Sequence, residues 1–142
     1  MEKARSREKA LEYVAANKLL TLATVEDQTP WAVTAFYACN KDFHLFFFSN
    51  PETKHCQDIL KNPNVAVTIN QEQEKGEVRG VQLVGVAKEV EEANYETAYQ
   101  LYHARYPWAD NYPDHTLYEI TPTALYYLDS ELLGNHFKIQ II

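Results

Sequence analysis

Residues 46–63, FFFSNPETKHCQDILKNP, pass from an apolar strand through a polar turn into a short helix. The three phenylalanines end at Ser49, and Asn50-Pro51 supplies the turn and the early helix. The helix stops before Pro63, because proline disfavours helical geometry in the residue that precedes it. Such a junction is either an ordinary strand-to-helix connection or a turn that holds an anion.

Segments rich in β-branched and aromatic residues lie on both sides of this junction and predict antiparallel strands. Gly80 and Gly85, inside the longest strand, indicate a bulge, a bend or the close approach of another group. The sequence therefore predicts a mainly β fold, a small antiparallel barrel of six or seven strands with helices packed outside. The predicted helices cover about residues 3–17, 52–60 and 93–105. The predicted strands cover residues 19–27, 31–39, 43–49, 65–70 and 78–92, two short segments on either side of Thr121-Pro122, and part of residues 136–142.

Length and composition limit the classes of function. A chain of 142 residues favours one domain over residues 1–142. Its net charge of −7 opposes binding to nucleic acid, which needs clustered Lys and Arg. The N-terminal segment lacks the apolar core of a signal peptide, and no apolar run is long enough to span a bilayer, so we expect a cytoplasmic protein without a membrane partner. Cys39 and Cys56 have no metal-type spacing and no paired histidine motif occurs, so no metal site is predicted.

Polar donors gather where the helix after Ser49 begins. Thr53 can cap that helix, and the free N–H groups of a helix N-terminus attract anions. Lys54 adds a positive charge there, and His55 is a further donor. In the ordinary interpretation Ser49 ends the strand, Thr53 caps the helix and Lys54 extends into solvent. Spacing alone leaves both interpretations open.

The strand VRGVQLVGVA, residues 78–87, is a second candidate site. Its two glycines allow a flat group to lie close to the backbone. Gln82 faces the opposite side of the strand from Arg79, and its amide can form hydrogen bonds with a ligand. The alternative is that the glycines only bend the barrel and that Gln82 faces water.

The order of these elements resembles the FMN-binding split-barrel family related to pyridoxamine 5′-phosphate oxidase, and within it a bacterial branch. The likeness covers the chain from about Leu20 to Asp129. It implies an antiparallel split β-barrel that forms a homodimer, with two FMN sites at the subunit interface that are each built from both chains. The segments that carry the likeness are WAVTAFY (31–37), NPNVAVTIN (62–70), RGVQLVGVA (79–87) and AYQLYHARYPWA (98–109).

The resemblance also assigns residues to the cofactor. The turn and the start of the short helix match the phosphate-contacting segment of the family. The middle of the second strand matches the segment whose backbone faces the isoalloxazine ring, the phenylalanine-rich strand lines the apolar part of the site, and the long strand contributes an amide. The residues assigned in this way are Val33, Thr34, Ala35, Phe48, Ser49, Thr53, Lys54, His55 and Gln82.

The chain departs from the oxidases of the family in two places. Those enzymes carry a basic residue on the strand equivalent to AVTAFYA, and an Arg-x-His pair near the C-terminus where this chain has GNHFKIQII. We therefore expect not a pyridoxine-phosphate oxidase but an FMN flavoprotein that passes hydride or electrons from a nicotinamide cofactor to a small-molecule acceptor. The alternatives are a non-catalytic protein of this fold that binds a flavin, a deazaflavin or haem, and an interaction-only dimer with an empty site.

Overall fold

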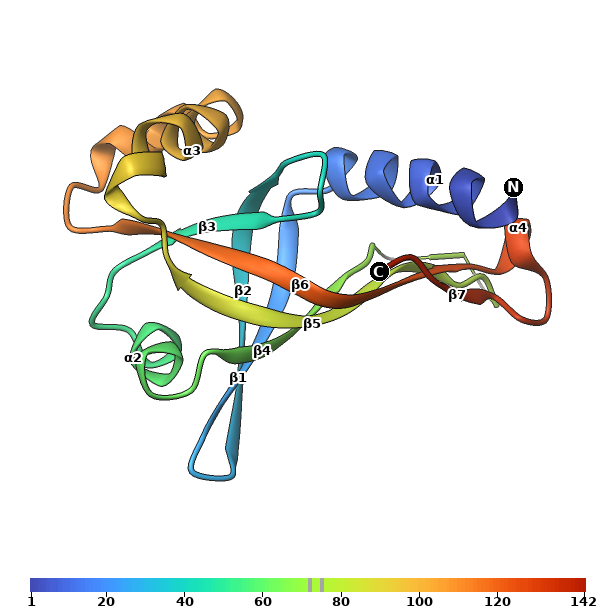
Figure 1. Cartoon of the computed structure of the whole chain (residues 1–142), viewed down its shortest axis with the longest axis horizontal. Coiled ribbons are helices and arrows are strands. Elements are labelled where there is room, and N and C mark those ends of the chain that lie inside the picture. Colours follow the sequence, from blue (N-terminus) through green and yellow to red (C-terminus); the bar gives the residue numbers. More distant parts are fainter. Residues whose placement is uncertain (72, 75) are drawn as a thin grey trace.

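A closed antiparallel barrel forms the body of the computed structural model (Figure 1). The structure describes residues 1–71, 73–74 and 76–142. Neighbouring strands follow the order β3-β2-β1-β4-β5-β6, and pairing between β3 and β6 closes the barrel, while β7 (Lys138–Gln140) adds to the free edge of β6. The barrel strands are β1 (Leu19–Glu26), β2 (Thr29–Cys39), β3 (Leu45–Ser49), β4 (Asn64–Ile69), β5 (Arg79–Glu89) and β6 (Thr116–Asp129).

Helices flank the barrel at its two ends. In Figure 1, α2 and α3 lie at one end of the molecule, and α1 and α4 lie at the other. Among the described residues, no helix is both long enough and apolar enough to cross a bilayer. The helices are α1 (Glu2–Ala16), α2 (Lys54–Lys61), α3 (Glu92–Arg105) and α4 (Ser130–Leu133), with a 3-10 turn, η1, at Pro107–Asn111.

The predicted fold class, a mainly β antiparallel barrel with flanking helices, is confirmed. The prediction of two short strands around Thr121-Pro122 is wrong, because β6 runs unbroken through both residues. Residues 116–120 pair with β3 and residues 126–128 pair with β7. Pro122 lies between these two ladders, where its missing N–H interrupts neither of them.

β5 has a bulge at Gly85 where it pairs with β6, and a bulge is one of the three features that the sequence indicated for Gly80 and Gly85. The register between the strands shifts at Val84/Gly85. A Cβ atom on Gly85 would collide with the carbonyl oxygen of Thr121 and would lie 3.1 Å from Pro122 Cα. Only glycine fits this close backbone approach without a shift of β6.

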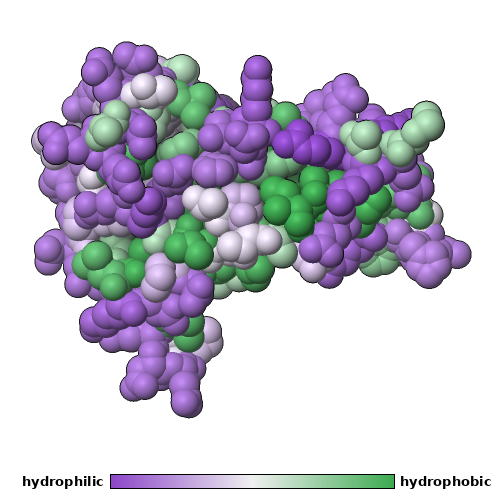
Figure 2. All heavy atoms as spheres, in the orientation of Figure 1, coloured by the Kyte–Doolittle hydropathy of each residue, from purple (hydrophilic) through white to green (hydrophobic). Residues whose placement is uncertain are grey.

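The core fills the barrel, with a second cluster beneath α3. Inward-facing side chains alternate with outward-facing ones along each strand, as the burial pattern of β5 illustrates. On the face shown in Figure 2, apolar side chains form a band over the region of β5 and β6, with hydrophilic side chains above and below. The main cluster includes Leu20, Leu22, Phe47, Val67, Leu83 and Leu125, and the second includes Phe46, Tyr102, Tyr106 and Leu117.

The Gly85 bulge gives a test of the fold. We expect Gly85→Ala to lower the free energy of unfolding by about 1–3 kcal/mol, because the added methyl group forces β6 away from β5. Urea denaturation followed by circular dichroism measures the change. Lys88→Ala, on the exposed face of the same strand, is the control and should have little effect. Equal stability of Gly85→Ala and the unmodified protein would contradict the close approach.

Candidate functional site

Three predicted residues, Ser49, Thr53 and His55, meet at the junction of β3 and α2. His55 Nε2 lies 3.0 Å from Ser49 Oγ and 3.4 Å from Thr53 Oγ1. All three side chains are half-buried. The strand end, the turn and the first turn of the helix thus place two hydroxyl groups and an imidazole in one cluster.

Asn50 and Pro51 shape the turn that brings these residues together. The Asn50 side-chain oxygen accepts a hydrogen bond from the Glu52 N–H at 2.9 Å, an Asx-type turn. The Asn50 carbonyl oxygen accepts from both the N–H and the hydroxyl of Thr53, at 3.1 and 2.9 Å. The chain reverses within these few residues, so α2 begins directly beside the end of β3.

The first turn of α2 keeps its amide donors available. Thr53 is the N-cap residue, but its hydroxyl donates to the Asn50 carbonyl and does not cap the helix. Within the described residues, no acceptor is found for the N–H groups of Lys54, His55 and Cys56. Free N–H groups and the helix dipole favour a negative charge at this point.

Burial keeps the His55 ring neutral. Desolvation lowers the pKa of His55, and the nearby charge of Asp58 opposes this only in part. The ring also packs against Phe47, with centroids 6.0 Å apart. A neutral imidazole has one N–H donor and one acceptor nitrogen, so His55 can donate to an anion or accept from the Ser49 hydroxyl, but it adds no charge to the turn.

The ammonium group of Lys54 points away from this cluster and toward the buried carboxylate of Asp58. Lys54 Nζ lies 3.1 Å from Asp58 Oδ1, 3.7 Å from Glu26 Oε2 and 5.5 Å from the centre of the Trp31 ring. The Asp58 side chain is only 1% exposed, and Thr24 donates to its other oxygen at 2.8 Å. Burial alone would raise the pKa of Asp58, but the hydrogen bonds from Thr24 and Lys54 outweigh it and hold that pKa below its ordinary value.

The predicted residues of the second strand face two different ways. Val33 and Ala35 are partly buried and pack against the barrel core. Thr34 lies on the outer face of the sheet, directly opposite Thr21 of β1. Any group that contacts this segment from outside the barrel therefore meets the Thr34 side chain and the backbone on either side of it.

Phe48 lies against α3 and not against the polar turn. Its ring is 5.7 Å from that of Tyr102 and 5.8 Å from that of Tyr99. Side chains alternate along a strand, so the neighbouring Phe47 is the phenylalanine that faces His55. The sequence alone does not distinguish the two phenylalanines, because both belong to one apolar run.

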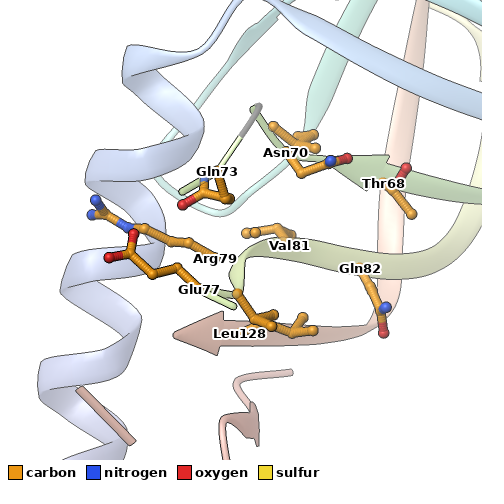
Figure 3. Close-up of a pocket in the computed structure, with 11 residues that line it drawn as sticks. Thr68, Asn70, Gln73, Glu77, Arg79, Val81, Gln82 and Leu128 are labelled. Atoms are coloured by element: carbon orange, nitrogen blue, oxygen red, sulfur yellow. The ribbon is translucent and has the colours of Figure 1, made fainter. Parts of the chain in front are cut away.

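Gln82 lies on the outer face of β5, in a cavity of about 340 Å³. Figure 3 shows Gln82 and Thr68 at one end of this cavity and Arg79 at the end nearest to α1. Gln82 pairs with Thr68, whereas Asn64, just after α2, pairs with Val86, four residues further along β5. That separation is roughly 13 Å along the strand, so one chain does not bring Gln82 to the Ser49 turn.

Several residues of these sites were missed by the sequence reasoning. The four-residue spacing of Lys54 and Asp58 on one helix is a signal that predicts their ion pair. Nothing in the sequence indicates that Glu26 and Trp31, from the β1–β2 hairpin, also approach Lys54. These contacts depend on how the hairpin lies across the end of the barrel.

The fold and the site together define a closed antiparallel barrel with polar side chains and free N–H groups at the start of an outer helix. Residues 6–129 match the family described as pyridoxamine 5′-phosphate oxidase. The chain therefore belongs to the pyridoxamine 5′-phosphate oxidase family, and the resemblance seen in the sequence is confirmed.

The chain is also similar to individual relatives and solved structures. A UPF0306 protein of Photorhabdus laumondii is 31% identical over 97 residues, which cover 67% of this chain and 68% of the relative. A haem-binding protein from Mycobacterium smegmatis has a TM-score of 0.81 at 18% identity, covering 95% of this chain and 57% of that longer chain. An FAD-binding protein from Mesorhizobium loti has a TM-score of 0.71 at 20% identity, covering 83% of this chain and 90% of the other. At these identities the two structures show a shared fold.

The buried ion pair gives a test with a defined pH dependence. We expect Asp58→Asn to lower the free energy of unfolding at pH 7 by about 1–3 kcal/mol, because it removes the charge that Lys54 and Thr24 stabilise. The ionised carboxylate contributes its full stabilisation above the ordinary Asp pKa of 3.8, and this is lost as pH falls through the lower pKa of the folded protein. The difference between the two proteins should therefore begin to narrow as pH falls below 3.8.

Urea denaturation at pH 7 and at steps between pH 5 and pH 3 would measure this difference. Asp42→Asn, at an exposed turn, is the matched control and should have little effect on stability. A stability difference that stays constant across this pH range would mean that the Asp58 charge is not what stabilises the fold.

Proposed function

We propose that this protein is a flavoprotein that holds the phosphate of FMN at the start of α2. The observation that carries the proposal is the set of free donors there, namely the N–H groups of the first helical turn beside Ser49, Thr53 and His55. A phosphate offers three strong acceptor oxygens and a charge that the helix N-terminus favours. The shared fold with an FAD-binding protein supports the choice of a flavin.

The donor set fits a phosphate, but the charge is arranged differently from the sequence expectation. Lys54 already pairs with Asp58 and Glu26, so most of its charge is offset. We infer that neutral hydroxyl, imidazole and amide donors hold the phosphate and that Lys54 acts mainly on Asp58. Hydrogen bonds to a charged acceptor contribute about 1.5–3 kcal/mol each, so three of them supply about 4.5–9 kcal/mol toward the roughly 8 kcal/mol that a micromolar site represents.

Bound FMN would supply hydride and electron transfer, and the chain would supply binding and orientation. We propose reduction by a nicotinamide cofactor and transfer to a small acceptor. His55 is neutral and already contacts Ser49, so its part is to orient the phosphate. The alternative is non-catalytic binding of a flavin, a deazaflavin or haem, and the haem-binding protein of the same fold supports the last of these.

We also propose that two copies of the chain pair through the outer face of the sheet. One row of small apolar side chains crosses five neighbouring strands, and Val84 in this row is 48% exposed. Such a face lets a second sheet approach closely, and contiguous exposed apolar surface of this kind marks interfaces. The row consists of Ala32, Ala23, Ala66, Val84 and Ala124.

This pairing would account for the distance between Gln82 and the turn. Gln82 and Thr34 belong to the next row of the same outer face, together with Thr21 and Thr68. A second copy on this face covers that row as well. Each cofactor site would then take the Ser49 turn from one chain and Gln82 from the partner subunit.

Flavin binding is tested by adding FMN to the purified protein, removing free FMN on a desalting column and recording the visible absorbance spectrum. We expect flavin bands to stay with the protein. The double variant Ser49→Ala/His55→Ala should weaken FMN binding at least about tenfold, since it removes two phosphate donors. Titration of FMN fluorescence measures the dissociation constants.

Two controls distinguish the loss of phosphate contacts from a general disruption of the folded protein. His103→Ala removes an exposed histidine on α3 that pairs with Asp110 and should leave FMN binding unchanged. Riboflavin, which lacks the phosphate, should bind equally to the double variant and the unmodified protein. Absence of retained flavin in the unmodified protein would contradict the proposal, and a Soret band would favour the haem alternative.

The dimer is tested by analytical ultracentrifugation. We expect the unmodified protein to sediment as a dimer and Val84→Glu to sediment as a monomer, because a charge would be buried against the partner's apolar face. Leu101→Glu, at a side chain 36% exposed on α3, is the matched control and should remain dimeric. A monomeric unmodified protein, or a dimeric Val84→Glu variant, would rule out this interface.

A further inference from the structure

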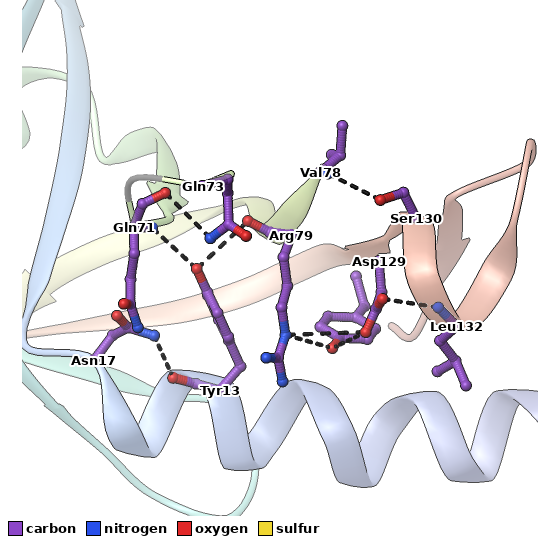
Figure 4. Close-up of polar contacts among 10 residues, drawn as sticks. Tyr13, Asn17, Gln71, Gln73, Val78, Arg79, Asp129, Ser130 and Leu132 are labelled. Atoms are coloured by element: carbon purple, nitrogen blue, oxygen red, sulfur yellow. Dashed lines mark hydrogen bonds and ion pairs between the residues drawn. The ribbon is translucent and has the colours of Figure 1, made fainter. Parts of the chain in front are cut away.

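Arg79, at the start of β5, carries a guanidinium group that is fixed in place but only partly used. The group lies over the Tyr13 ring, 4.9 Å from its centre. Its Nε atom lies 3.4 Å from the Tyr127 hydroxyl and 3.9 Å from Asp129 Oδ2. Within the described residues the two terminal nitrogens form no hydrogen bond, and Figure 4 shows them directed toward α1.

A network of hydrogen bonds holds the surroundings of Arg79 rigid. The Tyr13 hydroxyl donates to the Arg79 carbonyl oxygen at 3.4 Å and accepts from the Gln71 N–H at 3.0 Å. Asp129 accepts from the Leu132 N–H at 2.9 Å and from the Tyr127 hydroxyl at 2.8 Å, so both of its oxygens are engaged (Figure 4). A planar guanidinium with two free nitrogens, held in this way, matches two oxygens of a phosphate.

Two further cations line the cavity beside Arg79. Arg5 and Lys9 lie one turn apart on α1 and border a cavity of about 250 Å³ together with Arg79. Neither forms an ion pair within the described residues, and like charges four positions apart on a helix repel each other. The cavity also has two carboxylates, the engaged Asp129 and the exposed Glu131. Three cations here contrast with the net charge of −7 of the chain.

We propose that this cavity binds a phosphate group, with Arg79 as the two-pronged donor and Arg5 and Lys9 as supporting charges. An incoming dianion would relieve the repulsion between Arg5 and Lys9 and would engage the free nitrogens of Arg79. Asp129 orients the guanidinium from behind, because its nearer oxygen faces Nε and not the terminal nitrogens. The ligand is inorganic phosphate or the phosphate of a larger monoester.

This cavity is distinct from the Ser49 turn. It lies between α1 and α4, and these helices are at the opposite end of the molecule from α2 (Figure 1). It contains none of the donors at the Ser49 turn, although Arg79 also lines the cavity that holds Gln82. Substitution of Ser49 and His55 therefore separates phosphate binding here from phosphate binding at the α2 turn.

Isothermal titration calorimetry with inorganic phosphate tests the proposal, carried out in the Ser49→Ala/His55→Ala background so that the α2 turn does not contribute. We expect saturable binding of one phosphate per chain. Adding Arg5→Gln/Lys9→Gln should weaken it at least about tenfold. Lys18→Gln/Lys88→Gln removes the same charge from exposed residues outside the cavity and should leave the affinity within about twofold, since exposed distant charges are screened.

The outcomes separate the specific site from a general charge effect. Absence of phosphate binding in the background variant, or equal weakening by both pairs of substitutions, would overturn the proposal. Arg79→Gln should abolish phosphate binding, and circular dichroism checks that this variant remains folded. If the Arg79→Gln variant does not fold, the Arg5→Gln/Lys9→Gln variant still tests the proposal. Phenyl phosphate that binds more tightly than inorganic phosphate would identify a phosphomonoester as the ligand, and equal affinities would identify free phosphate.

Discussion

Pairing of β3 with β6 closes the barrel, and the position of the candidate flavin site follows from this closure. The last pair of the ladder joins Ser49 to Thr116, so the chain must leave the sheet at Ser49. The Asn50 turn then starts α2 at the rim of the barrel, where its first N–H groups have no neighbouring strand to bond to. A helix start with free N–H groups is thus a consequence of where a six-stranded barrel closes.

The buried carboxylate of Asp58 determines where the positive charge of Lys54 lies relative to that turn. Asp58 is enclosed by α2 and β1, and an unpaired charge there would cost several kcal/mol. Lys54 and Thr24 offset this cost, so the main role of Lys54 is to stabilise the Asp58 carboxylate at the junction of β3 and α2. The residues left for a ligand are neutral donors. Their strength depends on good geometry, which the Asn50 turn and the packing of His55 on Phe47 provide.

Much of the fold could be predicted from the sequence, because strand and helix patterns are local. The order of helices and strands needed only periodicity and turn residues. The place of Gly80 and Gly85 inside a strand indicated a bulge, a bend or a close approach, and the bulge is at Gly85. Thr121-Pro122 led to the wrong prediction of two short strands. Proline is tolerated inside β6 because it lies between the segment that pairs with β3 and the segment that pairs with β7. The contact of Ser49, Thr53 and His55 was predictable, because these residues are close in the sequence. The position of Gln82 relative to them was not, because it depends on which strands become neighbours.

The two proposed phosphate sites use different physical means to bind similar groups. At the α2 turn, donors without a full charge would bind the phosphate through hydrogen bonds of defined geometry, so ionic strength should weaken this binding less. At the α1 cavity, Arg5 and Lys9 act over longer distances and are exposed or half-buried, so ionic strength should weaken them strongly. Only the Arg79 fork there has fixed geometry, because Tyr13 and Asp129 hold it. One site is therefore suited to retaining a cofactor, and the other to responding to the concentration of a free anion.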